Sequence, residues 1–484
     1  MHKLRWLLAL LAVFALVAAA CGDDDDDTSS SESEQVESEG SEEQAAAEEE
    51  TAEEEGAEEE AEEEEAEEEG AEEDAAAGEL ATGIGVDDET IKIGYNADLS
   101  GIFAPLVIQI IDATEVYWET VNENGGIAGR MVEPVILDNA YDVPTHLENY
   151  EELSGDGDSG VVMIGQSTGS PHTAATSEDL VADDLIAIPL SWYSGWADPA
   201  IGANVFEVQT NYCIEAMNGV TYMSETYGTN VAIVSFPGEY GQDGAQGAKL
   251  AAEALGLTVV YDGEAAVVPG SDQTPVITEV VNSGADFVWG TINPTTLGEI
   301  MGGAVAQGFE GAWSGNSPTY NFQLLATDLG EALDQYYIHS TYTALWNTDD
   351  TPGMTEVVEA MRAKRPDAPV SDVYLIGWIN GIIVETILEQ AAANGDMTRA
   401  GVVAAANEIT ADLKGLAPDQ TWSGDPNDYI VRESYIYDVN LASFTPEGTV
   451  SDEDAGTGYE LIKGPYVSPT AEAYEYTGAC FTAE

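Results

Sequence analysis

From residue 90 onward, short apolar runs of strand length alternate with longer stretches of helical spacing, and this alternation constrains the fold most. A strand is predicted over 91–95, and a helix over 105–121 that ends at the Asn-Glu-Asn-Gly-Gly segment 122–126. After residue 209 the same cycle begins again. The other predicted elements are strands over 132–138, 160–164, 185–189, 230–236, 258–261, 286–290 and 312–314, and helices over 209–227 and 244–255. This pattern predicts an α/β fold in which helices cover parallel sheets, built twice as two Rossmann-like lobes.

The segments that follow the predicted strands have the composition of a binding cleft. Ligands of such folds bind beyond the carboxyl ends of the strands, where loops and helix N-termini meet. Here those segments are rich in Ser, Thr, Asn, Gly and aromatic residues and poor in charge: 98–103, 138–142, 165–173, 190–196, 237–241, 291–294 and 315–320. A few polar groups within aromatic walls favour the binding of a small solute.

The first 21 residues have the layout of an export signal. A basic start is followed by an apolar run over 6–20, which is shorter than the about 20 residues that span a membrane. The segment 16–21 resembles the bacterial lipoprotein signal, in which the cysteine is lipidated and everything before it is removed. A plain secretory signal is the alternative, but the polar segment after Cys21 favours a tether. We therefore predict a signal peptide over 1–20 and a lipid on Cys21 that anchors the chain to the outer face of the cytoplasmic membrane.

An acidic, low-complexity segment follows the lipidated cysteine. Residues 23–74 hold 30 of the 92 Asp and Glu and none of the 12 Lys and Arg. A block of like charges without aromatic residues cannot bury enough apolar surface to order itself, so 21–88 is predicted to be a disordered linker. The remaining chain is also strongly acidic, which excludes nucleic acid as a general partner.

Several short motifs, in a fixed order, resemble one known family. They include Ile-Lys-Ile-Gly at 91–94, Val-Asn-Glu-Asn-Gly-Gly-Ile-Ala-Gly at 121–129, Leu-Asp-Asn-Ala-Tyr-Asp at 137–142 and Ser-Gly-Ala-Asp at 283–286. The ordered set is similar to the leucine/isoleucine/valine-binding protein family, the type I periplasmic binding proteins of branched-chain amino-acid ABC importers, over roughly 89–445. The resemblance implies lobe one from 89–209 plus 337–432 and lobe two from 210–336 plus 433–484, joined by a three-crossover hinge.

The resemblance also implies a set of ligand-binding residues. Family members hold the solute's carboxylate with hydroxyls and backbone amides of lobe one and cover it with an aromatic ring of lobe two, which corresponds to Tyr240. The predicted set is Phe103, Tyr141, Gly169, Ser170, Ser191, Trp192, Tyr193, Tyr240, Asn293 and Asn316.

One position departs from the family pattern. The family places an acidic residue after a lobe-two strand to bind the ligand's amino group, but 314–317 reads Ser-Gly-Asn-Ser. A buried ammonium without a paired charge costs several kcal/mol, on the order of a lost buried ion pair. Either Asn316 with an acid such as Asp142 or Glu239 compensates, or the ligand is not an α-amino acid. Amides, urea-like compounds and small carboxylates therefore remain open.

Cys213 and Cys480 remain once Cys21 is lipidated. A pair of cysteines in an oxidising compartment indicates a disulfide, with two free thiols as the alternative. Under the lobe division that the resemblance implies, the bond would staple the C-terminal tail within lobe two and leave the hinge free. His146, His172 and His339 lack a metal-binding spacing, and we expect no metal and no cofactor.

Two other function classes compete with solute binding. The Gly165-x-Ser167-x-Gly169 pattern matches the nucleophile elbow of serine hydrolases, for which His339 and Asp286 are the nominated partners. A ligand-sensing receptor component is the other. We expect no enzyme. The predicted function is capture of a small solute by hinge closure, in a monomer whose partners are the solute and an ABC permease and which touches the membrane through its lipid alone.

The surplus of acidic residues generates a first prediction. Self-repulsion among exposed carboxylates weakens as salt screens them, so a salt-adapted protein gains stability with ionic strength. We expect the melting temperature to rise as sodium chloride is added. A melting temperature that does not change with salt would contradict this.

Overall fold

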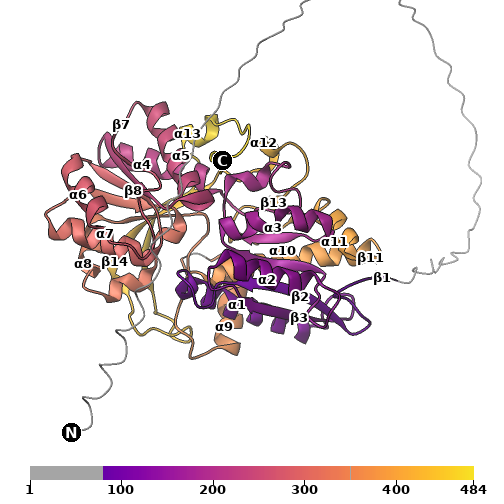
Figure 1. Cartoon of the computed structure of the whole chain (residues 1–484). Coiled ribbons are helices and arrows are strands. Elements are labelled where there is room, and N and C mark those ends of the chain that lie inside the picture. Colours follow the sequence, from indigo (N-terminus) through magenta and orange to yellow (C-terminus); the bar gives the residue numbers. More distant parts are fainter. Residues whose placement is uncertain (1–79, 349, 484) are drawn as a thin grey trace, which may run out of the picture. The chain divides into compact units, whose positions relative to one another are not determined.

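The computed structural model describes residues 80–348 and 350–483, so the predicted signal peptide, Cys21 and most of the predicted linker lie outside the described residues. Two four-stranded parallel sheets form the framework (Figure 1). The first has the order β3-β2-β4-β5, with β2 at Thr90–Ala97, β3 at Met131–Asp138, β4 at Met163–Thr168 and β5 at Ala187–Leu190. The predicted α/β fold is confirmed.

Helices from distant parts of the chain cover the first sheet. Its helices are α1 (Ala104–Glu123), α2 (Val143–Ser154), α3 (Ser170–Ala182), α9 (Pro352–Lys364), α10 (Tyr374–Ala393) and α11 (Arg399–Ala406). In Figure 1, α10 and α11 (orange) lie beside purple elements from the first half of the chain. Helices α1 and α10 approach closely because α10 presents glycines there. A Cβ on Gly377 would lie 2.3 Å from the carbonyl oxygen of Ile110.

The second sheet repeats the arrangement with the order β7-β6-β8-β9. Its strands are β6 (Asn230–Ser235), β7 (Thr258–Gly263), β8 (Phe287–Thr291) and β9 (Ala312–Gly315), and its helices are α4 (Tyr212–Thr226), α5 (Gly238–Leu255), α6 (Thr274–Ser283), α7 (Pro294–Ala306) and α8 (Gly330–Tyr336). Strands β6 and β8 are almost wholly buried, as expected where helices cover both faces of a parallel sheet. Within 80–348 and 350–483, no helix combines the length and apolarity needed to cross a bilayer.

An antiparallel sheet joins the second lobe through a bridge between Trp313 and Tyr337. Its strands are β10 (Ile338–Thr341), β14 (Ser434–Phe444) and β15 (Thr457–Tyr466), in the order β10-β14-β15. The predicted boundary at 337 assigns β10 to lobe one, but its pairing with β14 places it in lobe two. The smaller elements are β1 (Ala81–Thr82), β11 (Asp396–Met397), β12 (Thr410–Ala411), β13 (Gln420–Thr421), α12 (Pro426–Tyr429), α13 (Pro469–Ala473) and the 3₁₀ helices η1 (Ser194–Ala197), η2 (Ser317–Thr319) and η3 (Phe322–Ala326).

Three further predicted boundaries differ from the structure by four residues or more. Strand β4 runs from Met163 to Thr168, not over 160–164, because its polar second half is buried and pairs with β2 and β5. Helix α5 begins at Gly238 and not at residue 244. The fold begins before residue 89, since β1 pairs with β11 and the carbonyl of Gly85 accepts a hydrogen bond from Lys92. Such short backbone pairings leave no periodic signal in the sequence.

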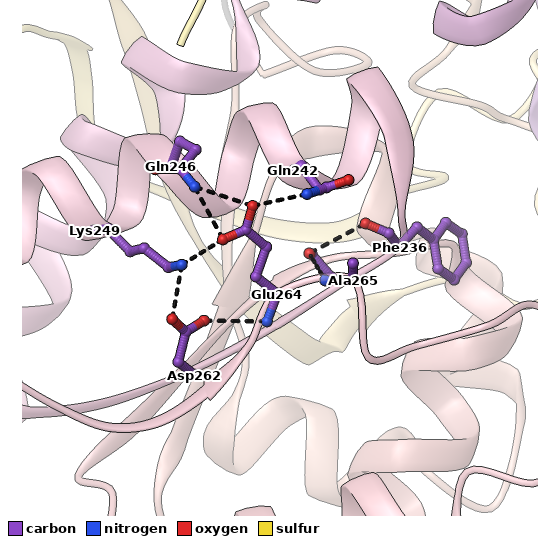
Figure 2. Close-up of polar contacts among 8 residues, drawn as sticks. Phe236, Gln242, Gln246, Lys249, Asp262, Glu264 and Ala265 are labelled. Carbon is purple, nitrogen blue, oxygen red and sulfur yellow. Dashed lines mark hydrogen bonds and ion pairs between the residues drawn. The ribbon is translucent and has the colours of Figure 1, made fainter. Parts of the chain in front are cut away.

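Helix α5 is fastened to the end of β7 by a charged cluster, which Figure 2 shows. Lys249 of α5 forms ion pairs with Glu264 and, at 2.7 Å, with Asp262. Gln242 and Gln246, one and two turns along α5, donate to the same Glu264 carboxylate at 2.9 Å. In this strongly acidic chain, Lys249 thereby pairs with both carboxylates, and the two glutamine amides supply hydrogen bonds to Glu264.

The predicted disulfide between Cys213 of α4 and Cys480 is present. The expectation that it confines the C-terminal tail to lobe two is wrong. The tail also contacts η1, which follows the lobe-one strand β5: the Cys480 amide donates to Ser194 Oγ at 2.8 Å, and the Tyr476 hydroxyl donates to the Ser194 carbonyl at 2.7 Å. The disulfide therefore anchors a segment that joins the two lobes.

Candidate ligand-binding cleft

A cavity lies between the two lobes where the carboxyl ends of their strands converge. It encloses about 810 Å³ of empty space, counting the part that opens to solvent. Most of its wall is apolar or aromatic. Among the described residues, no Lys or Arg lines it, and its one carboxyl group belongs to Asp372.

One end of the cavity is polar and is built around the first turn of α3. Ser170 is the first residue of this helix, so the positive end of the helix dipole lies here. Pro171 has no amide hydrogen and the Thr173 amide donates to the Gly169 carbonyl, so the first turn offers the amides of Ser170 and His172. Gly169 precedes it with a φ of 103°, a conformation that side-chain-bearing residues rarely adopt. Ser170 Oγ lies 2.6 Å from Ser191 Oγ, which also accepts a hydrogen bond from the Trp196 indole. This environment suits an anionic group.

Aromatic rings from both lobes surround the polar end. The ring centroid of Phe103 lies 4.9 Å from that of Tyr141 in lobe one and 5.9 Å from that of Tyr240 in lobe two. Tyr212 lies 4.8 Å from Tyr240, and Trp192 stacks on Tyr342 at 4.3 Å. Because the contact between Phe103 and Tyr240 crosses between the lobes, Tyr240 covers the polar end only when the lobes are together.

The loop that presents Phe103 is held by a buried carboxylate. Asp98 at the end of β2 accepts hydrogen bonds from the amides of Gly101 at 2.5 Å and Phe103 at 2.8 Å. Burial raises the pKa of this carboxyl above its ordinary value. The turn places Phe103 directly before α1, whose next residues form the cavity wall.

An apolar stretch of the cavity wall lies along α1 and the start of α10. Leu106, Val107 and Ile110 line it from α1, and Val373 and Ile376 line it from the start of α10. From Phe103 to Ile110 a helix advances about 10 Å, so the wall has the length of an alkyl chain and not of a single methyl group.

Six of the ten predicted ligand-binding residues line this cavity. They are Phe103, Tyr141, Gly169, Ser170, Trp192 and Tyr240. Ser191 lies behind Ser170 and supports it, as its hydrogen bond indicates. Tyr193 points instead to the C-terminal tail, where its hydroxyl donates to the Phe481 carbonyl at 2.6 Å.

The two predicted asparagines do not line the cavity either, because both are engaged in structural contacts. Asn293 caps α7 through the Thr296 amide and donates weakly, at 3.5 Å, to the Ile102 carbonyl of the other lobe. Asn316 is fully buried and donates to Glu215 at 2.7 Å. Neither Asp142, which caps α2, nor Glu239 lines the cavity, so neither acid stands where the family's acidic residue would.

Several lining residues were not predicted from the sequence. Tyr212, Ser317, His339, Tyr342 and Asp372 all line the cavity. Most of them lie in segments at or after the lobe crossovers, beyond the strand ends on which the sequence prediction relied. The one sequence signal for these lining residues was the presence of aromatic residues in the crossover segments.

The residues nominated for a serine hydrolase do not assemble. Ser167 is buried within β4, outside the cavity wall, and lies 3.3 Å from His146 Nε2. His146 Nδ1 faces the Asn139 amide nitrogen at 3.0 Å, so Nδ1 accepts and the ring proton sits on Nε2, where it donates to Ser167. Burial lowers the pKa of His146 to about 3. Asp286 binds the backbone amides of Thr229 and Asn230 instead.

Over 80–348 and 350–483, no group of three or more His, Cys, Asp and Glu side chains could hold a metal ion.

Two hinged lobes with a solute-sized cavity between their strand ends define a two-lobe binding protein. A family model described as periplasmic binding protein matches residues 90–445. The chain belongs to this family, whose members act outside the cytoplasm, and the resemblance to leucine/isoleucine/valine-binding proteins is confirmed.

Individual relatives agree with this assignment. The Leu/Ile/Val-binding protein homolog 8 of Brucella abortus is 26% identical over 318 residues, covering 60% of this chain and 73% of the relative. A fatty acid ABC transporter substrate-binding protein from Thermomonospora curvata has a TM-score of 0.72 and 29% identity, covering 82% of this chain and 97% of that one. A branched-chain amino acid ABC transporter structure from Thermus thermophilus with bound valine has a TM-score of 0.67 and 18% identity, covering 80% and 99%.

Buried carboxyl groups join the parts of the molecule that meet at the cleft. Asp243 of α5 accepts hydrogen bonds from Ser194 Oγ at 2.5 Å and the Ser194 amide at 3.1 Å, across the lobes. Glu215 of α4 holds Asn316 and the Ser317 amide, and Asp372 accepts from Thr457 of β15 at 2.7 Å. Burial raises the pKa of Asp243 and Asp372 to about 7 and that of Glu215 to about 8.

These shifts predict a pH-dependent stability. Because the folded pKa values lie above the unfolded ones, the folded state binds these protons more tightly, and the stability gained in acid is lost as pH rises through about 7 to 8. We expect the melting temperature at high salt to be lower at pH 8 than at pH 5, and an Asp243→Asn variant to show a smaller difference. A melting temperature that is equal or higher at pH 8 would contradict this.

Proposed function

We propose that the chain is an extracytoplasmic solute-binding lipoprotein that captures a carboxylic acid with an apolar chain and delivers it to an ABC importer. The observation that carries this proposal is a cavity that is apolar along α1 and α10 and ends at the first turn of α3. An amphiphilic acid matches both parts of this wall.

The carboxylate would lie at the polar end. The donors available there are the hydroxyls of Ser170 and Thr168 and the amides of Ser170 and His172, because Pro171 has no amide hydrogen. A helix N-terminus stabilises an anion without a paired cation, which fits a wall that lacks Lys and Arg among its described residues.

The apolar part of the cavity wall argues against amides and urea-like compounds, the wholly polar solutes that the sequence left open. An amide or a urea-like compound would leave the wall of Leu106, Val107, Ile110 and Ile376 without an apolar partner. An α-amino acid bound at Ser170 would also bring its ammonium into an aromatic enclosure with no carboxylate beside it. A similar protein, from Thermomonospora curvata, is described as a fatty acid transporter component, which supports the same ligand class.

Capture would proceed by hinge closure. The acid first binds lobe one, which supplies α1 and α3, and lobe two then covers it with Tyr212 and Tyr240. Binding stabilises the closed form by the contacts that only this form makes. The closed lobes would then dock on the permease.

The ligand proposal is tested by calorimetric titration with medium-chain straight carboxylic acids, their methyl esters and valine. We expect the acids to bind and the esters to bind at least about tenfold more weakly, because a charge-assisted hydrogen bond is lost. Ser170→Ala should weaken acid binding by a similar factor. Ser177→Ala, on the same helix but bonded to the Ala174 carbonyl, is the matched control and should change nothing.

Two outcomes would contradict the proposal. Tight binding of valine together with no binding of the acids would assign the cleft to amino acids. Equal binding of acids and methyl esters would show that α3 does not hold a carboxylate.

The anchoring part of the proposal rests on Cys21 and is tested separately. Lipid attached to this sulfur should carry the protein into the membrane fraction and incorporate labelled fatty acid. We expect Cys21→Ser to abolish the label and release the protein from the membrane. A variant that remains membrane-bound and labelled would contradict the lipoprotein assignment.

A further inference from the structure

A cluster of polar aromatic side chains lies in the cavity wall apart from Ser170. Tyr320, His339 and Tyr459 all line the cavity, and their ring centroids lie 5.2 to 5.9 Å apart. Asp372 completes the cluster. Its carboxyl group accepts hydrogen bonds from Thr457 Oγ1 at 2.7 Å and the Trp346 amide at 3.3 Å.

Two polar atoms of this cluster have no partner. The Tyr320 hydroxyl and His339 Nδ1 are buried and make no hydrogen bond, and both residues are at least nine-tenths buried, with exposed fractions of 3% each. A buried polar atom without a partner costs free energy, and folded proteins leave few of them unpaired. Because both residues line the ligand cavity, a bound ligand is one source of the missing partners.

The cluster stands further along the cavity than the carboxylate site. Thr341 lies beside Ser317, with their hydroxyls 3.0 Å apart, and the next residue, Tyr342, stacks on Trp192 near the polar end. His339 is two residues back along the same face of β10, which displaces it by about 7 Å. The apolar residues of α1 and α10 therefore line the same cavity as two separate polar regions.

We infer that Tyr320, His339, Tyr459 and Asp372 form a second polar subsite, which binds a hydroxyl group carried on the chain of the bound carboxylic acid. The inference rests on the proposed function, since it takes the carboxylate at Ser170 as given. It narrows the ligand class from acids with a plain apolar chain to acids whose chain carries a hydroxyl group.

A neutral hydroxyl suits this subsite better than a charged group. Burial lowers the pKa of His339 to about 3, so its ring is neutral, with one nitrogen to accept and one to donate. Burial also raises the pKa of Asp372 to about 7, so the protonated carboxyl is accessible near neutrality. A hydroxyl both donates and accepts. An ammonium would instead need an ionised acid, and Asp372 already accepts from Thr457, the Trp346 amide and Tyr459.

The experiment compares medium-chain acids with their ω-hydroxy and ω-amino analogues of the same length, by calorimetric titration of the purified protein. We expect one chain length at which the hydroxy acid binds about 3- to 10-fold more tightly than the plain acid, the value of one or two buried hydrogen bonds. The amino analogue should bind more weakly than the hydroxy acid.

Two variants and a matched control locate the effect. Tyr320→Phe and His339→Phe should each reduce the preference for the hydroxy acid, while binding of the plain acid is retained or strengthened. Tyr337→Phe is the control: its hydroxyl is also buried and unpaired and its ring stacks on Tyr320 at 4.7 Å, but it does not line the cavity. It should leave the preference unchanged.

The outcomes separate this inference from the function on which it rests. Equal binding of plain and hydroxy acids at every length would overturn the subsite alone and assign the two unpaired atoms to water. A preference that survives both variants would do the same. Failure of every acid to bind would overturn the proposed function and the subsite with it.

Discussion

A parallel sheet that is covered by helices on both faces leaves only the ends of its strands open to a ligand. The whole arrangement of this protein depends on that constraint. Strands such as β6 and β8 are buried on both faces, so loops and helix N-termini at their carboxyl ends are the available recognition surface. The chain forms two such recognition surfaces, one in each lobe, and they face each other. The first turn of α3 from one lobe and Tyr240 from the other thereby reach the same cavity.

Buried carboxyl groups form the hydrogen bonds that join the segments around the cavity. Asp243 joins α5 to η1 of the other lobe, Glu215 holds the turn at Ser317, and Asp372 joins the start of α10 to β15. In a chain with so many acids, these three differ from the exposed ones because burial raises their pKa values toward neutrality. Protonation lets them bridge segments without burying a charge. The C-terminal tail adds a covalent junction through Cys213 and Cys480.

The sequence predicted the elements whose signal is local and missed those set by tertiary contacts. The regular alternation located most strands, but the polar second half of β4 carries no apolar pattern and was assigned to a loop. Ser170 and Tyr240 were predicted from the family resemblance, at positions that follow strand ends. Tyr193 was predicted in the same way but turns toward the tail. His339 and Asp372 enter the cavity through crossover segments, whose positions depend on how the lobes are joined. The Cys213–Cys480 pair was predicted, but the contact of its tail with lobe one was not.

The central claim is that the cavity holds an amphiphilic acid with its carboxylate at the first turn of α3 and its chain between α1 and α10. Anomalous diffraction from crystals grown with a medium-chain carboxylic acid that bears bromine on its terminal carbon tests this directly. The account predicts a bromine peak between the two helices, near Ile110 and Ile376, with carboxylate density at Ser170. A bromine peak beside Ser170, or no peak within the cavity, would contradict it.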